Sequence, residues 1–189
     1  MSNYIINASG VTVFMKKLVV VYLSTSGNTK RMADAIVEGA DSRGISAESV
    51  SFYDVDISNI LNADAIAIGS STFWYKMHDA MERFLDRLSK ENFKGKVGAA
   101  FGSYGWSGEA PVQIAQKMRE MGITVVDPVL RVQYDPDDKD IKECERLGKD
   151  IAKAIKAEKP PKDIDKDVKP PKSGKKGGKP PKNGKKGKK

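Results

Sequence analysis

An uninterrupted apolar run, Leu18 to Leu23, limits the fold more than any other feature of the sequence. The run is rich in β-branched residues, which favours a strand, and no polar residue alternates with the apolar ones. A strand without such alternation is buried on both faces. It therefore requires a layer of helices on each side of its sheet.

Strand and helix patterns alternate along the chain after this run. Further strands are predicted at 47–52, 65–68, 97–101 and 123–126. Apolar residues at helical spacing predict helices over 32–40, 57–61, 77–88, 111–118 and 141–155, the last one capped by Asp137 with Asp140 three residues on. This alternation predicts an α/β fold with a parallel sheet, right-handed crossovers and helices on both faces.

The net charge of +8 comes from the C-terminal end of the chain. Residues 159–189 hold 13 Lys and 3 Asp and repeat Lys-Pro-Pro-Lys three times, whereas residues 1–158 hold 20 basic and 22 acidic residues. With so few apolar residues, segment 159–189 is predicted to be a disordered tail. Its lysines are suited to salt-dependent binding of a polyanion. The alternative is that the tail only keeps the protein in solution and has no specific partner. The folded domain is expected over residues 15–158, after an N-terminal extension at 1–14.

The chain has one Cys, Cys144, and one His, His78. An intramolecular disulfide, a structural zinc site and a multi-histidine iron site all need more such residues, so no metal site is expected. Cys144 should pack as a small apolar residue, and His78 should be an exposed helix residue, with proton donation as the alternative. We expect a cytoplasmic protein without a membrane span, because the sequence lacks a secretory leader and an apolar run of about 20 residues.

Three loops at the carboxyl ends of the predicted strands carry the candidate site residues, since ligands bind at that edge of parallel sheets. The first loop joins hydroxyls and a glycine to a helix start, which favours a phosphate, and comprises Ser24, Thr25, Ser26, Gly27, Asn28 and Thr29. The second holds consecutive aromatics and comprises Ser71, Thr72, Phe73, Trp74 and Tyr75. The third mixes aromatics with glycines and includes Ser103, Tyr104, Gly105, Trp106 and Gly108. A flat aromatic ligand with one phosphate, such as FMN, would fit.

These motifs resemble those of the flavodoxin-like family. The first loop matches its phosphate pattern at Ser24, Ser26, Gly27 and Thr29, and the run FGSYGWSGEA from Phe101 is most similar to the flavodoxin domain of flavodiiron proteins, the A-type flavoproteins. The resemblance runs from about Lys17 to Lys156. It implies a three-layer, doubly wound, five-stranded parallel sheet of order 2-1-3-4-5, of the short-chain type, with FMN bound by the three loops.

The resemblance also implies an electron-transfer protein with redox partner proteins, and a flavodiiron-type partner would be a separate chain because the histidines of an iron centre are lacking here. Two alternatives stay open: an NAD(P)H-dependent flavin or quinone reductase, and a module that the basic tail tethers to nucleic acid. A carrier is expected more than a stand-alone enzyme, as a monomer or a homodimer.

Trp106 is the expected stacking residue on one flavin face, and Trp74 and Phe73 are equal candidates for the other. Lys76 is expected to be a solvated loop residue, with a flavin-facing position as the alternative.

Overall fold

Strand β3 (Lys17–Leu23) lies inside the main sheet, with a strand on each side, and is buried on both faces. The computed structural model describes residues 4–6 and 12–157. Along β3, Leu18 and Val20 contribute to one apolar core and Val19 and Val21 to another, and all four side chains are 0% exposed. The continuous apolar run of the sequence thus supplies both cores at once.

The main sheet is parallel throughout and confirms the expected strand order. Strand β3 pairs with β4 (Ser46–Ser51) on one side and with β5 (Ala65–Ser70) on the other. Strand β8 (Val97–Tyr104) follows β5, and β10 (Leu130–Gln133) closes that edge, while β9 (Thr124–Val125) pairs with the beginning of β8.

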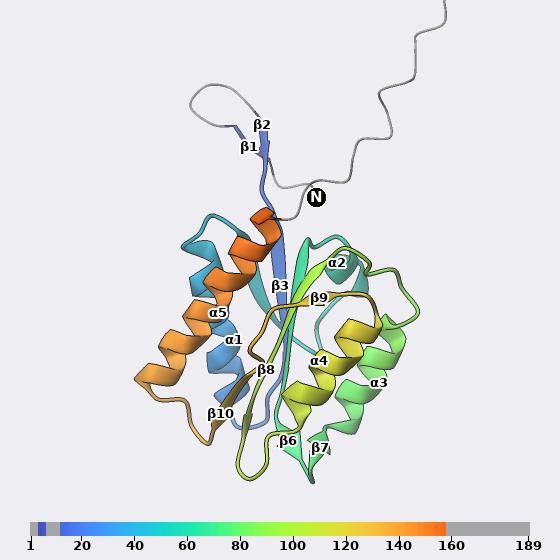
Figure 1. The fold of residues 1–189 in the computed structure, drawn as a ribbon, viewed down its shortest axis with the longest axis vertical. Coiled ribbons are helices and arrows are strands. Elements are labelled where there is room, and N and C mark those ends of the chain that lie inside the picture. The colour runs from blue at the N-terminus through green and yellow to red at the C-terminus, as the bar shows by residue number, and fades with distance from the viewer. Residues whose placement is uncertain (1–3, 7–11, 158–189) are drawn as a thin grey trace, which may run out of the picture. The chain divides into compact units, whose positions relative to one another are not determined.

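Helices cover both faces of the sheet, as Figure 1 shows. One layer contains α1 (Asn28–Asp41) and α5 (Asp138–Ala157). The other contains α2 (Ile57–Leu61), α3 (Asp79–Leu88) and α4 (Ala110–Glu120). The predicted cap of the last helix is confirmed, because Asp137 accepts the Asp140 N–H at 2.9 Å and Asp140 accepts the Asp137 N–H at 3.1 Å.

The fifth strand differs from the prediction, which placed it only at 123–126. In the structure it consists of β9 and β10, with Pro128 between them. Proline has no N–H to donate, so it interrupts a ladder. Strand β10 alternates apolar and polar residues, LRVQ, as strands at an exposed edge do, and a search for continuous apolar runs misses it.

Residues 72–77 form a small antiparallel hairpin rather than a loop and a helix start. Strands β6 (Thr72–Phe73) and β7 (Lys76–Met77) pair with each other, so Met77 precedes α3 instead of belonging to it. Val112, one of the apolar residues whose spacing predicts the helix at 111–118, is 46% exposed. Cys144 packs in the core as expected, and its burial raises the pKa of the thiol to about 12.

In the predicted extension, β1 (Tyr4–Ile6) pairs antiparallel with β2 (Thr12–Phe14). The predicted tail, 159–189, lies outside the described residues, and its disorder stays a prediction. Within residues 4–6 and 12–157, no helix is long and apolar enough to cross a bilayer, and no cluster of three or more possible metal-binding side chains occurs.

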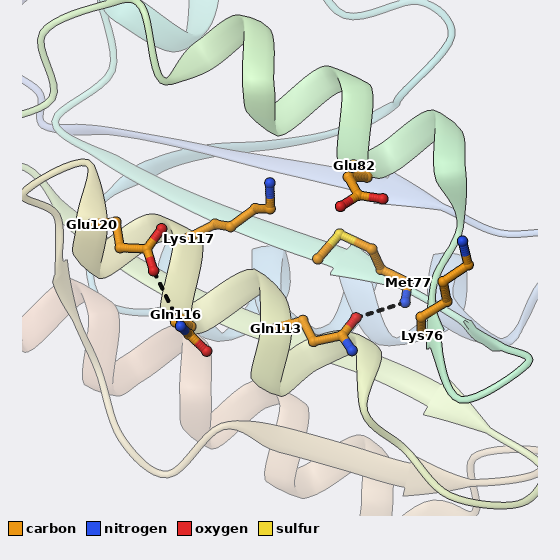
Figure 2. Close-up of a pocket in the computed structure, with 7 residues that line it drawn as sticks. All are labelled: Lys76, Met77, Glu82, Gln113, Gln116, Lys117 and Glu120. Carbon is orange, nitrogen blue, oxygen red and sulfur yellow. Dashed lines mark hydrogen bonds between the residues drawn. The ribbon is translucent and has the colours of Figure 1, made fainter.

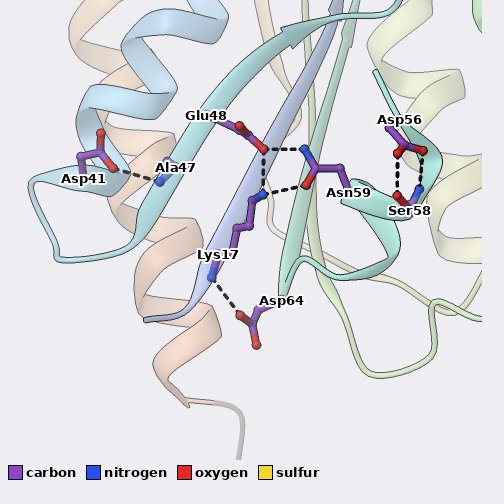
Figure 3. A network of polar contacts seen from close by, with 8 residues as sticks. All are labelled: Lys17, Asp41, Ala47, Glu48, Asp56, Ser58, Asn59 and Asp64. Atoms are coloured by element: carbon purple, nitrogen blue, oxygen red, sulfur yellow. Dashed lines mark hydrogen bonds and ion pairs between the residues drawn. The ribbon is translucent and has the colours of Figure 1, made fainter. Parts of the chain in front are cut away.

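A polar network fixes the amino end of β3 against its neighbours (Figure 3). The Lys17 ammonium contacts Glu48 of β4 at 2.9 Å and Asn59 of α2 at 2.8 Å, and the Asn59 amide donates to the same Glu48 carboxylate. The Asp64 carboxylate accepts the Lys17 backbone N–H at 2.8 Å. Half-exposed pairs of this kind contribute little stability, roughly 0–1 kcal/mol, so their effect is chiefly on the register of the edge strand.

Helices α1 and α5 touch at two glycines. A Cβ atom at Gly39 would lie 2.0 Å from the Glu145 carbonyl oxygen, and one at Gly148 would lie 2.1 Å from the Ile36 carbonyl oxygen. Both obstacles are backbone atoms, which cannot move aside without shifting a helix. The close approach therefore depends on the absence of a side chain at both positions.

We predict that Gly148→Ala destabilises the fold. Helix propensity alone would make alanine more stable by about 1 kcal/mol. The clash with Ile36 forces the helices apart and should outweigh that gain, for a net loss of about 1–3 kcal/mol. Urea unfolding of the variant and the wild-type chain measures the difference, and an increase in stability would show that α1 and α5 do not approach this closely.

Candidate functional site

The first loop, residues 24–29, connects β3 to α1 at the carboxyl edge of the sheet. Gly27 adopts a φ of 92°, and its N–H donates to the Ser24 hydroxyl at 3.1 Å. No side chain caps α1, and its first turn holds no acidic residue. By contrast, α3 and α5 both carry acidic residues in their first turns. The start of α1 is therefore suited to an anion, because its N–H groups and partial positive charge are not balanced by a carboxylate.

Thr29 connects this loop to the other two. Its side chain is 0% exposed, and its Oγ1 lies 3.1 Å from the Ser71 hydroxyl and 3.1 Å from the Ser103 hydroxyl. Ser71 follows β5, and Ser103 lies near the end of β8. The three predicted loops thus meet at one group of hydroxyls, here called the hydroxyl cluster: Thr29, Ser71 and Ser103.

The second loop is the β6–β7 hairpin, whose turn consists of Trp74 and Tyr75. Both residues have positive φ angles, 46° and 63°, which glycine and asparagine adopt far more easily than bulky side chains. Trp74 is 90% exposed and Tyr75 63% exposed. Phe73 instead packs against the His78 ring, edge to face, with centroids 5.4 Å apart.

The third loop follows β8 and leads into α4. Ser103 and Tyr104 belong to the strand itself, and Gly105, Trp106 and Gly108 follow it. Trp106 is 82% exposed. A Cβ atom at Gly108 would lie 3.0 Å from the Tyr104 ring, so glycine permits that ring to lie against the loop. The Thr72 hydroxyl accepts the Ala110 N–H at 3.1 Å and so ties the second loop to the start of α4.

A cleft of about 250 Å³ lies between the second and third loops. It is lined by Thr72, Trp74, Tyr75, Trp106 and Ser107. None of these five side chains is charged, and three of them are aromatic. The first loop does not line the cleft, and it meets the other two at the hydroxyl cluster. This aromatic cleft suits the flat face of a ring system.

A second pocket of about 280 Å³ lies beside the hairpin, between α3 and α4 (Figure 2). Its lining is polar or charged apart from Met77, and comprises Lys76, Met77, Glu82, Gln113, Gln116, Lys117 and Glu120. No aromatic ring is among these residues. Both of its lysines form ion pairs, Lys76 with Asp79 at 2.7 Å and Lys117 with Asp86 at 2.6 Å. We therefore place the candidate site at the aromatic cleft.

The ion pair of Lys76 also agrees with its expected role as a solvated lysine. Its side chain is 53% exposed, and Asp79 raises the pKa of the ammonium group. The expectation for His78 is wrong, however. His78 is half-buried and caps α3, because its Nδ1 accepts the Ala80 N–H at 3.1 Å. A histidine in this position accepts with Nδ1, which leaves the proton of the neutral ring on Nε2.

Tyr134 is a site residue that the sequence analysis did not select. Its carbonyl oxygen accepts from the Asn28 amide at 3.1 Å, and its N–H donates to the Tyr104 carbonyl at 2.7 Å. Its side chain is 63% exposed, and its ring would lie 3.8 Å from a Cβ atom placed at Gly105 of the third loop. Its position directly after β10, at the carboxyl edge of the sheet, would have indicated a site residue. The sequence analysis did not predict β10 and therefore did not select Tyr134.

Comparisons with known proteins show what this chain is similar to. The family model described as flavodoxin matches residues 20–148. A solved flavodoxin from the domain Archaea is 60% identical, with a TM-score of 0.73, over 74% of this chain and 99% of that chain. The flavodoxin of Clostridium beijerinckii is 34% identical over 70% of this chain and 97% of its own length.

Longer flavoproteins match as well. The anaerobic nitric oxide reductase flavorubredoxin of Vibrio vulnificus is 34% identical over 72% of this chain, but the match covers 29% of that protein. A diflavin flavoprotein of Thermosynechococcus vestitus is matched over 25% of its length. The chain thus spans less than a third of these longer relatives.

We predict that the double variant Trp74→Asn, Tyr75→Gly stabilises the chain in the absence of ligand. Asparagine and glycine favour the positive φ angles of this turn, and relief of the backbone strain should raise the free energy of unfolding by about 1 kcal/mol. Thermal unfolding measures the change. A loss of stability would mean that the two aromatic side chains contribute to the fold itself.

Proposed function

The chain belongs to the flavodoxin family, and on this premise we propose that it is an electron carrier that holds FMN between its three loops. Flavodoxins and A-type flavoproteins bind FMN. The observation that carries the proposal is the pairing of an aromatic cleft with an uncapped helix start. One end of the site suits a ring and the other a phosphate, and Thr29 links the two.

The residues of the first loop would hold the phosphate. The Ser24 hydroxyl lies at the start of α1, where it accepts the Gly27 N–H at 3.1 Å, and Thr25 and Ser26 are exposed to a ligand. Such a set of donors binds a phosphate without any lysine or arginine, since the helix end supplies partial positive charge. Asn28 is tied to Tyr134, which holds this end of the loop to the strand at the sheet edge.

Trp74 and Trp106 would lie against the ring. Both are more than four-fifths exposed and line the same cleft, whereas Phe73 is engaged with His78. This geometry favours Trp74 over Phe73 as the second stacking residue. Two indoles also exclude water from the ring faces.

Bound FMN supplies the redox chemistry, because its ring accepts and releases electrons. The charges of the surrounding protein determine how well negative charge on that ring is stabilised. The five side chains that line the cleft carry no charge, and Lys76 beside it is paired with Asp79. These surroundings would offer no positive charge to stabilise negative charge on a bound ring, which would keep its reduction potential low.

The acceptor we propose is a separate redox protein, with a flavodiiron-type oxidase or reductase as one candidate. Support comes from the sequence match to one part of a flavorubredoxin, which is described as an anaerobic nitric oxide reductase. The match covers a minor share of that protein. The reaction with oxygen or nitric oxide would therefore take place on the partner.

We predict that the purified chain binds one FMN and that Trp106→Ala weakens this binding at least about tenfold, because an aromatic stack and its buried area are lost. Titration of FMN fluorescence measures both affinities. Tyr53→Ala is a matched control, since Tyr53 is 75% exposed and does not line the cleft. It should change the affinity less than twofold. A chain that does not bind FMN would refute the proposed function.

We further predict that the FMN-loaded chain, once reduced chemically, passes its electrons to an oxidised redox protein within seconds, yet does not oxidise NADH or NADPH at a catalytic rate. Stopped-flow absorbance follows the first reaction, and absorbance at the nicotinamide band follows the second. Steady consumption of a nicotinamide would instead identify the chain as a reductase.

A further inference from the structure

Strand β4 forms one edge of the main sheet, since within the described residues it pairs with β3 alone. We propose that this edge is a dimer interface. Two copies of the chain pair their β4 strands antiparallel, about a two-fold axis that passes beside Ser49. The inference goes beyond the proposed function, because the aromatic cleft takes no part in it.

The backbone groups at the free edge follow from the ladder between β3 and β4. In a parallel pair, every second residue of a strand bonds to its neighbour, and the residues between them turn their N–H and C=O groups the other way. The N–H groups of Ser46 and Phe52 donate to the carbonyl oxygens of residues 16 and 22. The even-numbered residues therefore bond to β3, and Ala47, Ser49 and Ser51 face outward.

Two of the outward groups already have partners. The Ala47 N–H donates to Asp41 Oδ1 at 3.0 Å (Figure 3), and the Ser51 carbonyl accepts the Asp54 N–H at 2.9 Å. The other outward groups have no hydrogen-bond partner in residues 4–6 and 12–157, namely the Ala47 carbonyl, the Ser49 N–H and carbonyl, and the Ser51 N–H. Unpaired groups of this kind on an edge strand are a template for a further strand.

These unpaired groups complement themselves when Ser49 lies opposite Ser49 of a second copy. Each Ser49 N–H then donates to the other Ser49 carbonyl, and each Ser51 N–H donates to the Ala47 carbonyl of the other copy. The same register would also pair the Ala47 N–H with the Ser51 carbonyl. Those are the two groups that are already bonded within the chain. No unpaired group of the edge is left over.

The neighbouring registers fit less well. With Ser49 opposite Ser49, Glu48 faces Val50 of the second copy, so its carboxylate meets no like charge. A register with Glu48 opposite Glu48 would bring two carboxylates face to face. A register with Val50 opposite Val50 would need the Ser51 carbonyl, which is already bonded to Asp54.

Asp41 should limit the strength of the dimer. Its carboxylate occupies the Ala47 N–H at each end of the paired strands, where one more hydrogen bond per copy would otherwise form. A charged side chain at a strand edge commonly restricts pairing in this way. A short ladder also buries less area than a stable interface, so the association is weak. Antiparallel pairing points the carboxyl edges of the two sheets in opposite directions, which keeps both aromatic clefts open.

The test is sedimentation equilibrium of the full chain, freed of flavin, in about 0.3 M salt to screen its net charge of +8. We expect a reversible dimer with a dissociation constant of about 0.05–1 mM. Ser49→Pro removes the outward N–H and leaves the β3 ladder intact, and it should weaken the dimer at least about tenfold. Ser49→Ala is the matched control, because it loses only the hydroxyl contact with Asp34 and should dimerise as the wild type does.

A second pair of variants tests the register in the opposite direction. Asp41→Ala frees the Ala47 N–H and should tighten the dimer at least about fivefold. Asp41→Asn keeps a side-chain acceptor oxygen and should leave the dissociation constant within about twofold of the wild type. This pair decides the proposal even if Ser49→Pro does not fold, which thermal unfolding would show.

Amide hydrogen exchange locates the interface. With rising protein concentration, exchange at Ser49 and Ser51 should slow, whereas exchange at Ala47, which is already bonded, should not change. A chain that is monomeric at about 1 mM would refute the dimer. A dimer that ignores both Ser49→Pro and Asp41→Ala uses another surface and would overturn the assignment. Protection of these amides by an unrelated extended peptide, but not by concentration, would overturn it as well.

Discussion

The burial of β3 on both faces is the constraint on which the rest of this structure depends. Because neither face of Leu18 to Leu23 can meet water, the chain must supply helices above and below the strand. Helices that connect one strand to the next on both faces give a parallel sheet, and a parallel sheet has the carboxyl ends of all its main strands at a single edge. Hydroxyl-rich and aromatic loops that are far apart in the sequence become neighbours for this reason.

The sequence was sufficient for features that arise from local or periodic signals. The buried strands, the amphipathic helices and the Asp137 cap each follow from a pattern within a few residues. The strand order came from a resemblance, because no periodicity shows which strands pair. The split fifth strand was missed since β10 has the short alternation of an edge strand, which is a weak signal. The β6–β7 hairpin was missed because its turn uses Trp74 and Tyr75, where the usual signal would be asparagine and glycine.

In the site, too, local sequence features could be predicted and contacts between distant segments could not. The residues of the three loops could be chosen from the sequence because each loop has an unusual composition. Their joining through Thr29 could not, since a threonine followed by an amphipathic helix looks like an ordinary helix start. The contact of Asn28 with Tyr134 depends on tertiary structure in the same way. For His78 the error was a local one. We expected an exposed helix residue, but its ring accepts a hydrogen bond from the nearby Ala80 N–H.

The two exposed indoles have a practical consequence. Trp74 and Trp106 are the only tryptophans of the chain, and both line the same cleft. Ultraviolet emission excited selectively in indole thus originates entirely at one spot on the molecule. The natural chain already contains an optical reporter of that spot, and no dye or engineered label is needed to watch events there in real time.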